Sequence, residues 1–185
     1  MINDLLRETE GRMNKAIEAL EEEFRGLRTG RATPALIERV MVDYYGTPTP
    51  LKQLAVISAP EPQLLLVRPY DPGSLGAIEK AILQADLGFN PNNDGRVVRV
   101  PIPRLTEERR REMVKQVKRR VEEARVALRN VRRDALNDLR EFEEEKLISE
   151  DELKRAQEDL QKLTDQMIQQ VDELGERKEQ ELLEV

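Results

Sequence analysis

The sequence predicts an α+β fold in which a small, mostly β domain is inserted into a long antiparallel three-helix bundle. All ten prolines lie between Pro34 and Pro103, and all three tyrosines lie in the same stretch. After Pro103 the chain has no proline and a single glycine, Gly175. Because proline breaks helix interiors and glycine weakens them, the flanks are free to be helical and the middle is not.

The composition change indicates where the chain passes between the two domains. We expect residues 1–29 and 105–185 to form the bundle and residues 30–104 to form the inserted domain. A glycine in the first crossing permits an unusual backbone angle, and paired prolines in the second prevent helix formation. The predicted hinge consists of Gly30, Arg31, Pro101, Pro103 and Arg104. A rigid corner is the alternative interpretation of the same residues.

Three segments carry apolar residues at the alternating three- and four-residue spacing of one helix face. The members in the first segment are Ile2, Leu6, Met13, Ile17, Leu20, Phe24 and Leu27. The second segment has Met113, Val117, Val121, Ala124, Leu128, Val131, Ala135, Leu139 and Phe142. The third has Leu153, Ala156, Leu160, Leu163, Met167, Val171 and Leu174. Amphipathic helices of this kind bury their apolar stripes by packing on one another, either within one chain or in an intermolecular coiled coil.

Start signals place the second and third helices. Thr106, followed by two glutamates, is a weak start for a helix of residues 106–146, roughly 60 Å long at 1.5 Å per residue. Ser149 with Glu152 three residues later forms a capping box at the start of the third helix. The break between these two helices is short, which favours an antiparallel pair.

The middle of the chain predicts short strands around one helix. Strand-like composition occurs in residues 35–45, 51–58, 63–70 and 96–103. Residues 73–88 predict a helix that ends at Gly88, the usual C-terminal position for glycine. The segment NPNNDG has turn chemistry and only a loose likeness to a calcium loop.

Charge is segregated along the chain. The net charge is −2 for residues 1–103, +6 for 104–134 and −10 for 135–185. On a helical wheel, a basic stripe lies about 100° round from the apolar face of the second helix. Its members are Arg111, Lys115, Lys118, Arg125, Arg129 and Arg132. Further arginines that broaden this surface are Arg109, Arg110, Arg119, Arg120 and Arg133.

Two interpretations of the stripe remain open. Positions beside a bundle core commonly form ion pairs between helices, and the acidic third helix offers many partners. On the other hand, residues 125–133 contain no acid, so neutralisation within that segment is impossible, and the planar guanidinium suits phosphate. If phosphate is the ligand, the lack of aromatic residues on this helix favours structured RNA over stacked single strands.

Several classes of chemistry are unsupported by the sequence. Without cysteine or histidine there is no thiol nucleophile, imidazole catalyst or Cys/His zinc site. No phosphate-binding glycine motif is present, and acidic side chains on helices are most often solvated. We therefore predict no enzyme activity, no catalytic residue, no metal and no cofactor. No apolar run approaches ~18 residues, so we expect no membrane span and no membrane partner, and a cytoplasmic location. We separately expect the protein to be a monomer.

Several motifs in fixed order resemble the bacterial ribosome recycling factor family. They are GLRTGRATPALIERVMVDYYGTPTPLKQLA, IEKAI, LGFNPNNDG, PIPRLTEERR, RNVRRDA and ISEDE. The resemblance runs nearly from end to end. One departure is Phe89, where leucine is expected, which we interpret as a change in core packing. A second is the strong acidity of REFEEEKLISED, which argues against RNA contact at that end of the second helix.

The resemblance implies an L-shaped protein about the size of a transfer RNA, whose bundle binds 23S RNA of the large ribosomal subunit. It further implies that elongation factor G, using GTP, acts with the protein to split the post-termination ribosome into subunits and release mRNA and tRNA. No small-molecule substrate is implied. The residues that the resemblance implies contact RNA are Arg28, Arg31, Arg129, Arg132 and Arg133, with Arg132 the foremost and Arg110 a further candidate. Arg125 is added to this predicted set as a member of the basic stripe. A structural ion pair is the alternative role for Arg133.

A different class of function fits the helices alone. A coiled-coil adaptor or chaperone would grip a protein partner through the same amphipathic segments. Sedimentation with ribosomes over a salt series separates the two hypotheses, because an adaptor would remain in the supernatant at low salt.

Overall fold

The computed structural model describes residues 1–184. It has the predicted two-domain α+β fold, with contacts grouping the chain into two compact units. One unit contains residues 1–24 and 114–181, and the other contains residues 25–113 together with the end of the chain from Leu182. Whether the functional domain boundaries lie at 29/30 and 104/105 stays a prediction.

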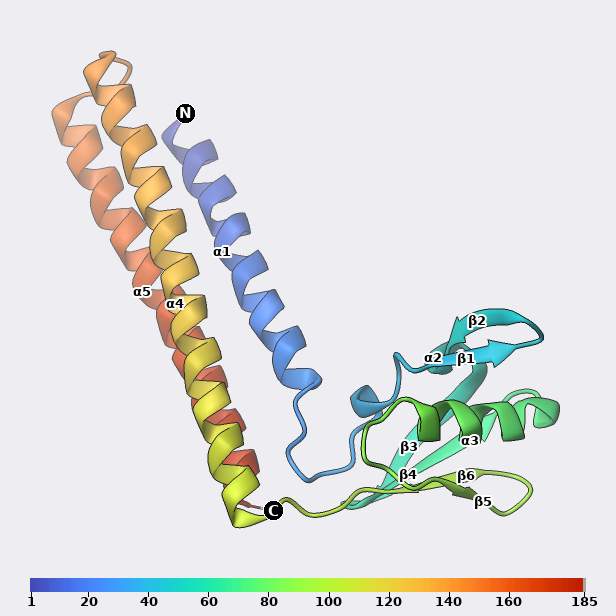
Figure 1. The fold of residues 1–185 in the computed structure, drawn as a ribbon. Helices are drawn as coiled ribbons and strands as arrows, with labels where there is room; N and C mark the ends of the chain where they lie inside the picture. Colours follow the sequence, from blue (N-terminus) through green and yellow to red (C-terminus); the bar gives the residue numbers. More distant parts are fainter. Residues whose placement is uncertain (185) are drawn as a thin grey trace. The chain divides into compact units, whose positions relative to one another are not determined.

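The bundle consists of α1 (Ile2–Arg25), α4 (Glu107–Glu144) and α5 (Glu150–Leu183). The three helices lie side by side, with α4 and α5 antiparallel (Figure 1). Their predicted apolar stripes meet in the core, where Met13, Val117 and Val171 are fully buried. The periodicity therefore identified both the helices and the faces that they bury.

Local chemistry ends α4 and begins α5 within a few residues. Lys146 adopts a left-handed conformation with φ 61°, and its N–H donates to the carbonyl of Glu143. The next N–H, of Leu147, donates to Phe142, which completes a Schellman motif without the usual glycine. The predicted capping box is confirmed, because Glu152 N–H donates to Ser149 Oγ at 3.1 Å and Ser149 N–H donates to Glu152 Oε1 at 3.3 Å.

The second unit contains a hairpin and a four-stranded antiparallel sheet. The hairpin joins β1 (Met41–Tyr44) to β2 (Thr47–Pro50). The sheet has the strand order β3-β4-β6-β5 and is formed by β3 (Ala55–Glu61), β4 (Leu64–Pro69), β5 (Asn92–Asn93) and β6 (Val98–Pro101). The helix α3 (Leu75–Gln84) lies between β1 and the β5–β6 side of this sheet (Figure 1). Ile78 and Ile82 of α3 are buried in the shared core.

A tyrosine pair fixes the hairpin to the chain that follows β4. Tyr45 and Gly46 both have positive φ, 50° and 87°, as a two-residue type I′ turn requires. The hydroxyls of Tyr44 and Tyr45 donate to Asp71 Oδ2 at 3.2 and 3.0 Å. Asp71 Oδ1 also accepts from the N–H of Gly73 at 2.9 Å. One carboxylate therefore links two otherwise separate segments.

Three predictions for this unit are wrong in detail. The segment 35–45 starts with a 3-10 turn, η1 (Pro34–Leu36), and becomes a strand only at Met41. The start of 51–58 is a short helix, α2 (Leu51–Leu54), with the strand beginning at Ala55. The helix predicted to end at Gly88 ends at Gln84, because Asp86 already takes the left-handed conformation, at φ 54°.

Candidate nucleic-acid interface

The candidate interface is the basic stripe along α4, on the side next to α5. The helix runs without interruption through the stripe, so the wheel positions derived from the sequence apply over its whole length. Thr106 starts it as predicted, with its Oγ1 accepting from Arg109 N–H at 3.1 Å. Val117 and Leu128 on the apolar face are completely buried, which fixes the rotation of α4 and turns the adjacent stripe outward.

Arg125 is the one stripe member that is paired with an acid of a neighbouring helix. Its Nε donates to Asp172 Oδ1 of α5 at 2.8 Å, and its Nη1 donates to Glu122 Oε2 at 3.1 Å. The bond to Asp172, followed by that to Glu122, raises the pKa of Arg125 above its ordinary value. Only a third of the side chain is exposed. The geometry is that of an ion pair joining two helices, which is the ordinary role for a charge at this position.

Arg129 has a weaker partner on its own helix. Its Nη1 lies 3.5 Å from Glu122 Oε1, and half of the side chain is exposed. The sequence argument excluded neutralisation by acids inside 125–133, and the partner comes instead from the turn that precedes this segment. Exposed pairs of this kind contribute little, about 0–1 kcal/mol, so phosphate can compete for Arg129.

Arg132 is held by a neutral group. Its Nη1 donates to the side-chain oxygen of Gln161 on α5 at 3.2 Å. The amide nitrogen of Gln161 in turn donates to Asp165 Oδ1 at 2.8 Å. Gln161 thereby orients the guanidinium while leaving its charge without a carboxylate partner. The sequence analysis did not identify Gln161. A neutral amide on a helix rich in acids could have indicated a position where an arginine of the neighbouring helix keeps its charge unpaired.

Two lysines of the stripe and the adjacent Arg133 extend the part of this surface that has no acidic partner among the described residues. Arg133, Lys115 and Lys118 are exposed, and within residues 1–184 no carboxylate comes within ion-pair distance of them. Together with Arg132 they form what we call the open stripe. Arg111, by contrast, pairs with Glu107 one turn earlier, although both side chains are more than three-quarters exposed.

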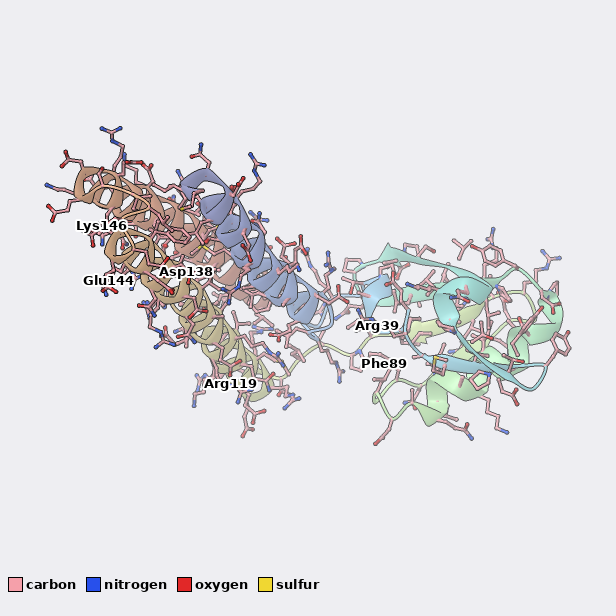
Figure 2. All side chains as sticks on the ribbon, turned by 90° about the horizontal axis from the view of Figure 1, so that it is seen from above. Arg39, Phe89, Arg119, Asp138, Glu144 and Lys146 are labelled. Atoms are coloured by element: carbon pink, nitrogen blue, oxygen red, sulfur yellow. The ribbon has the colours of Figure 1, made fainter. Side chains whose placement is uncertain are left out.

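Other arginines of the bundle act between or along helices. Arg120 Nη1 lies 2.9 Å from Glu23 of α1, and Arg12 of α1 lies 3.1 Å from Asp134 of α4. These pairs lie on the α1 side of α4, opposite to the open stripe. Figure 2 shows Arg119 in one half of α4 and the acidic end with Glu144 at the other. The helix α4 is therefore basic towards its start and acidic towards the α4–α5 loop.

The remaining predicted RNA-binding residues belong to the second unit. The Arg28 guanidinium lies over the ring of Phe89, with 5.4 Å between its carbon and the ring centroid. Arg31 and Arg104, one from each crossing, line a single pocket together with Glu61, Pro62 and Gln63. Arg110 is half-buried in the first turns of α4.

The predicted hinge residues differ in how firmly the second unit holds them. Pro101 is the last residue of β6 and pairs with Leu64, so it is part of the sheet. The N–H of Ile102 donates to Gln63 at 2.8 Å, which extends this attachment by one residue. Gly30 has φ 83°, a value that glycine adopts readily and other residues avoid. Pro103 and Arg104 are exposed and lie outside regular structure.

Two other features are absent from the part of the chain that the structure describes. Among residues 1–184 no group of three or more acidic side chains is arranged to hold a metal ion. No helix in this range is both long enough and apolar enough to cross a membrane.

Comparison with known proteins gives full-length matches. The family model described as ribosome recycling factor matches residues 20–183. The ribosome-recycling factors of Carboxydothermus hydrogenoformans and Heliobacterium modesticaldum are 58% and 57% identical over 185 residues, covering all of both chains. A solution structure of a ribosome recycling factor superposes with a TM-score of 0.79 at 48% identity, covering 100% of this chain and 98% of that one.

A second solved structure has a TM-score of 0.69 at 49% identity and covers 99% of each chain. It is described as models for the T. thermophilus ribosome recycling factor and the E. coli elongation factor G bound to the E. coli post-termination complex.

Proposed function

Because the chain belongs to the ribosome recycling factor family, we propose that it binds the post-termination ribosome through large-subunit RNA. With elongation factor G and GTP hydrolysis by that partner, it splits the ribosome into subunits, which frees mRNA and tRNA. The solved relative bound with elongation factor G on a post-termination complex supports both partners. The protein itself performs no bond chemistry and works as a monomer.

The open stripe is the observation that carries the RNA-binding part of this proposal. Arg132, Arg133, Lys115 and Lys118 present four charges on one side of α4, and within residues 1–184 none of them forms an ion pair, although Lys118 lines a pocket that also contains acidic residues of α5. Phosphates bound there release counterions, so affinity falls steeply with salt. The only aromatic residue of α4 is Phe142, which packs into the core, so base stacking contributes nothing. Recognition is then through the shape and backbone of folded RNA.

Replacement of Arg132 with alanine tests this role. We expect weaker binding to isolated large subunits, and a slope of log affinity against log salt that is reduced by about 0.7–0.9, the value for one phosphate contact. Arg177→Ala is the matched control, since Arg177 is exposed on α5 away from the stripe. An unchanged slope for Arg132→Ala would refute the phosphate contact, and sedimentation without ribosomes at low salt would favour a protein-binding adaptor.

The splitting step requires a stiff element that transmits force and a flexible joint between the two domains. The continuous α4, about 57 Å long at 1.5 Å per residue, is stiff enough to transmit a push delivered to the second domain. The joint is formed by the crossings at Gly30–Arg31 and Pro103–Arg104. Gly30→Ala, which is strained at φ 83°, is expected to slow subunit splitting more than it weakens binding. Equal losses in both assays would argue against a working hinge.

A further inference from the structure

Arg28, which is predicted to contact RNA, lies against Phe89 in the core of the α/β domain. Arg28 follows the end of α1, and Phe89 lies in the loop after α3. The guanidinium carbon is 5.4 Å from the ring centroid, within the range for cation–π attraction. The Nε of Arg28 is buried and has no hydrogen-bond partner. Among residues 1–184, Arg28 also has no ion pair, so the ring is the main group that holds its charged end.

The backbone beside the ring leaves room for the guanidinium. Gly88 has φ 78°, and a Cβ built there would lie 3.8 Å from Arg28 Nη1. The guanidinium therefore extends along the Gly88–Phe89 segment. Because Nε is buried, a phosphate can reach Arg28 only through the Nη groups.

Both partners are anchored to the same domain. Phe89 is 5% exposed and belongs to the same core cluster as Ala32, four residues after Arg28. The N–H of Ala32 donates to the carbonyl of Pro62 at 2.7 Å, next to the end of β3. Thr29, directly after Arg28, is also buried. Ala32 and Phe89 are thus held in the α/β domain, and Arg28 contacts this domain through the ring of Phe89.

We propose that Phe89 is a positioning residue that holds the Arg28 guanidinium on the α/β domain in the orientation that captures an RNA phosphate. This inference rests on the proposed function. A long, flexible side chain loses freedom when it binds, and an arginine already ordered by a ring loses less. Leucine at position 89 would fill the core but has no π face. It also follows that Arg28 forms an RNA contact separate from the open stripe.

A four-member cycle tests the coupling between the two residues. The parent, Arg28→Ala, Phe89→Leu and the double variant are titrated with large ribosomal subunits over a salt series. Arg28→Ala is expected to lower the salt slope by about 0.7–0.9. Phe89→Leu should weaken binding about two- to fivefold, as expected for loss of the cation–π contact that orders the guanidinium, and Arg28→Ala should add little in that background. An Arg28→Ala effect of equal size in both backgrounds would overturn the proposal.

Two measurements separate positioning from a general structural role. The Nε–H resonance of Arg28, shifted by the ring current of Phe89, should move in Phe89→Leu, and an unmoved resonance would contradict the contact. Phe89→Tyr keeps the π face and should bind like the parent, including its salt slope, even if its unfolding temperature falls. Arg96→Ala is the control for loss of an exposed arginine in this domain and should leave the slope unchanged.

Failure of this inference is distinguishable from failure of the proposed function. If Arg132→Ala lowers the salt slope while Arg28 and Phe89 act additively, only the positioning role is refuted. If Arg28→Ala has no effect on binding, the positioning role is likewise refuted. If neither Arg132→Ala nor Arg28→Ala changes the slope, the RNA-binding proposal itself is wrong.

Discussion

Gly175 of α5 packs tightly against Val121 of α4, and this contact gives a stability prediction with a definite sign. A Cβ built on Gly175 would lie 2.6 Å from Val121 Cγ2, with Val121 Cβ and Cγ1 at 3.8 and 3.9 Å. The shortfall from ordinary contact is close to 1 Å. Valine in a helix has one strongly preferred rotamer, so Val121 cannot rotate away cheaply. The helices must therefore separate or the side chains must strain.

The magnitude for Gly175→Ala is a difference of two opposing terms. Overpacking costs about 1–3 kcal/mol, and replacing an interior helical glycine with alanine gains about 1 kcal/mol. We expect a net loss of about 1 kcal/mol, or roughly 2–4 °C in unfolding temperature for a chain of this size. In a Val121→Ala background the clash is absent, so the same substitution should become stabilising by up to about 1 kcal/mol.

Urea denaturation followed by far-ultraviolet circular dichroism measures both effects, because the bundle supplies most of the helix signal. Gly11→Ala in α1 is the matched control, since nothing lies within 4 Å of a Cβ built there. It should stabilise the protein by about 1 kcal/mol in either background. If Gly175→Ala stabilises the parent as Gly11→Ala does, the close helix contact is not a constraint and the reasoning is refuted.

Two further predictions concern the stripe and the hairpin. Gln161→Glu should weaken binding to large subunits up to about fivefold, because an exposed ion pair worth up to about 1 kcal/mol would then compete for Arg132. Gln169→Glu adds the same charge elsewhere on α5, so equal affinities of the two variants would contradict this role. At the carboxylate that holds the hairpin, the hydrogen bond from the N–H of Gly73 is the largest cause of the lowered pKa of Asp71. The stabilisation by that charge is present above the unfolded pKa near 3.9 and is lost as pH falls through the lower folded pKa. Asp71→Asn should lower the unfolding temperature at neutral pH, and a gap from the parent that persists undiminished at pH 2 would refute the assignment.

The helices were predictable because local signals and burial agree along them. The apolar spacing, the capping box at Ser149 and the absence of proline all indicate the same elements. The second helix was expected over 106–146 and spans Glu107–Glu144. Lys146 ends it without glycine, so the terminator was not visible from composition.

The α/β domain was less predictable because its elements are short and depend on tertiary contacts. The strand Thr47–Pro50 contains two prolines, which argue against a strand except at an edge. It pairs only with β1, so its unpaired side tolerates them. Tyr45 in a left-handed turn position also has no sequence signal, since asparagine or glycine is usual there, and its bond to Asp71 is a contact between distant segments.

The position of the basic stripe was predictable from the sequence, but which of its arginines are paired with acids was not. The wheel placed Arg125 and Arg132 on the same side of α4, where they are equivalent by position. The register of an antiparallel pair folded near residue 147 brings Arg125 opposite Asp172 and Arg132 opposite Gln161. That register could have been estimated from the short loop, whereas the rotamers that complete each contact could not.

One partner residue on α5 therefore decides whether an arginine of α4 joins helices or remains available to a polyanion. Asp172 carries a full negative charge and accepts a hydrogen bond from Arg125. Glu122 accepts a second one, so Arg125 has two acidic partners. Gln161 supplies the same hydrogen-bond acceptor without the charge, and its amide hydrogens engage Asp165. Since an acidic α5 could neutralise any arginine that it faces, placing an amide opposite Arg132 keeps the orientation that an ion pair would give and retains the charge that phosphate binding requires. The RNA binding that we propose for the stripe thus depends as much on the neutral residue facing it as on the arginines that form it.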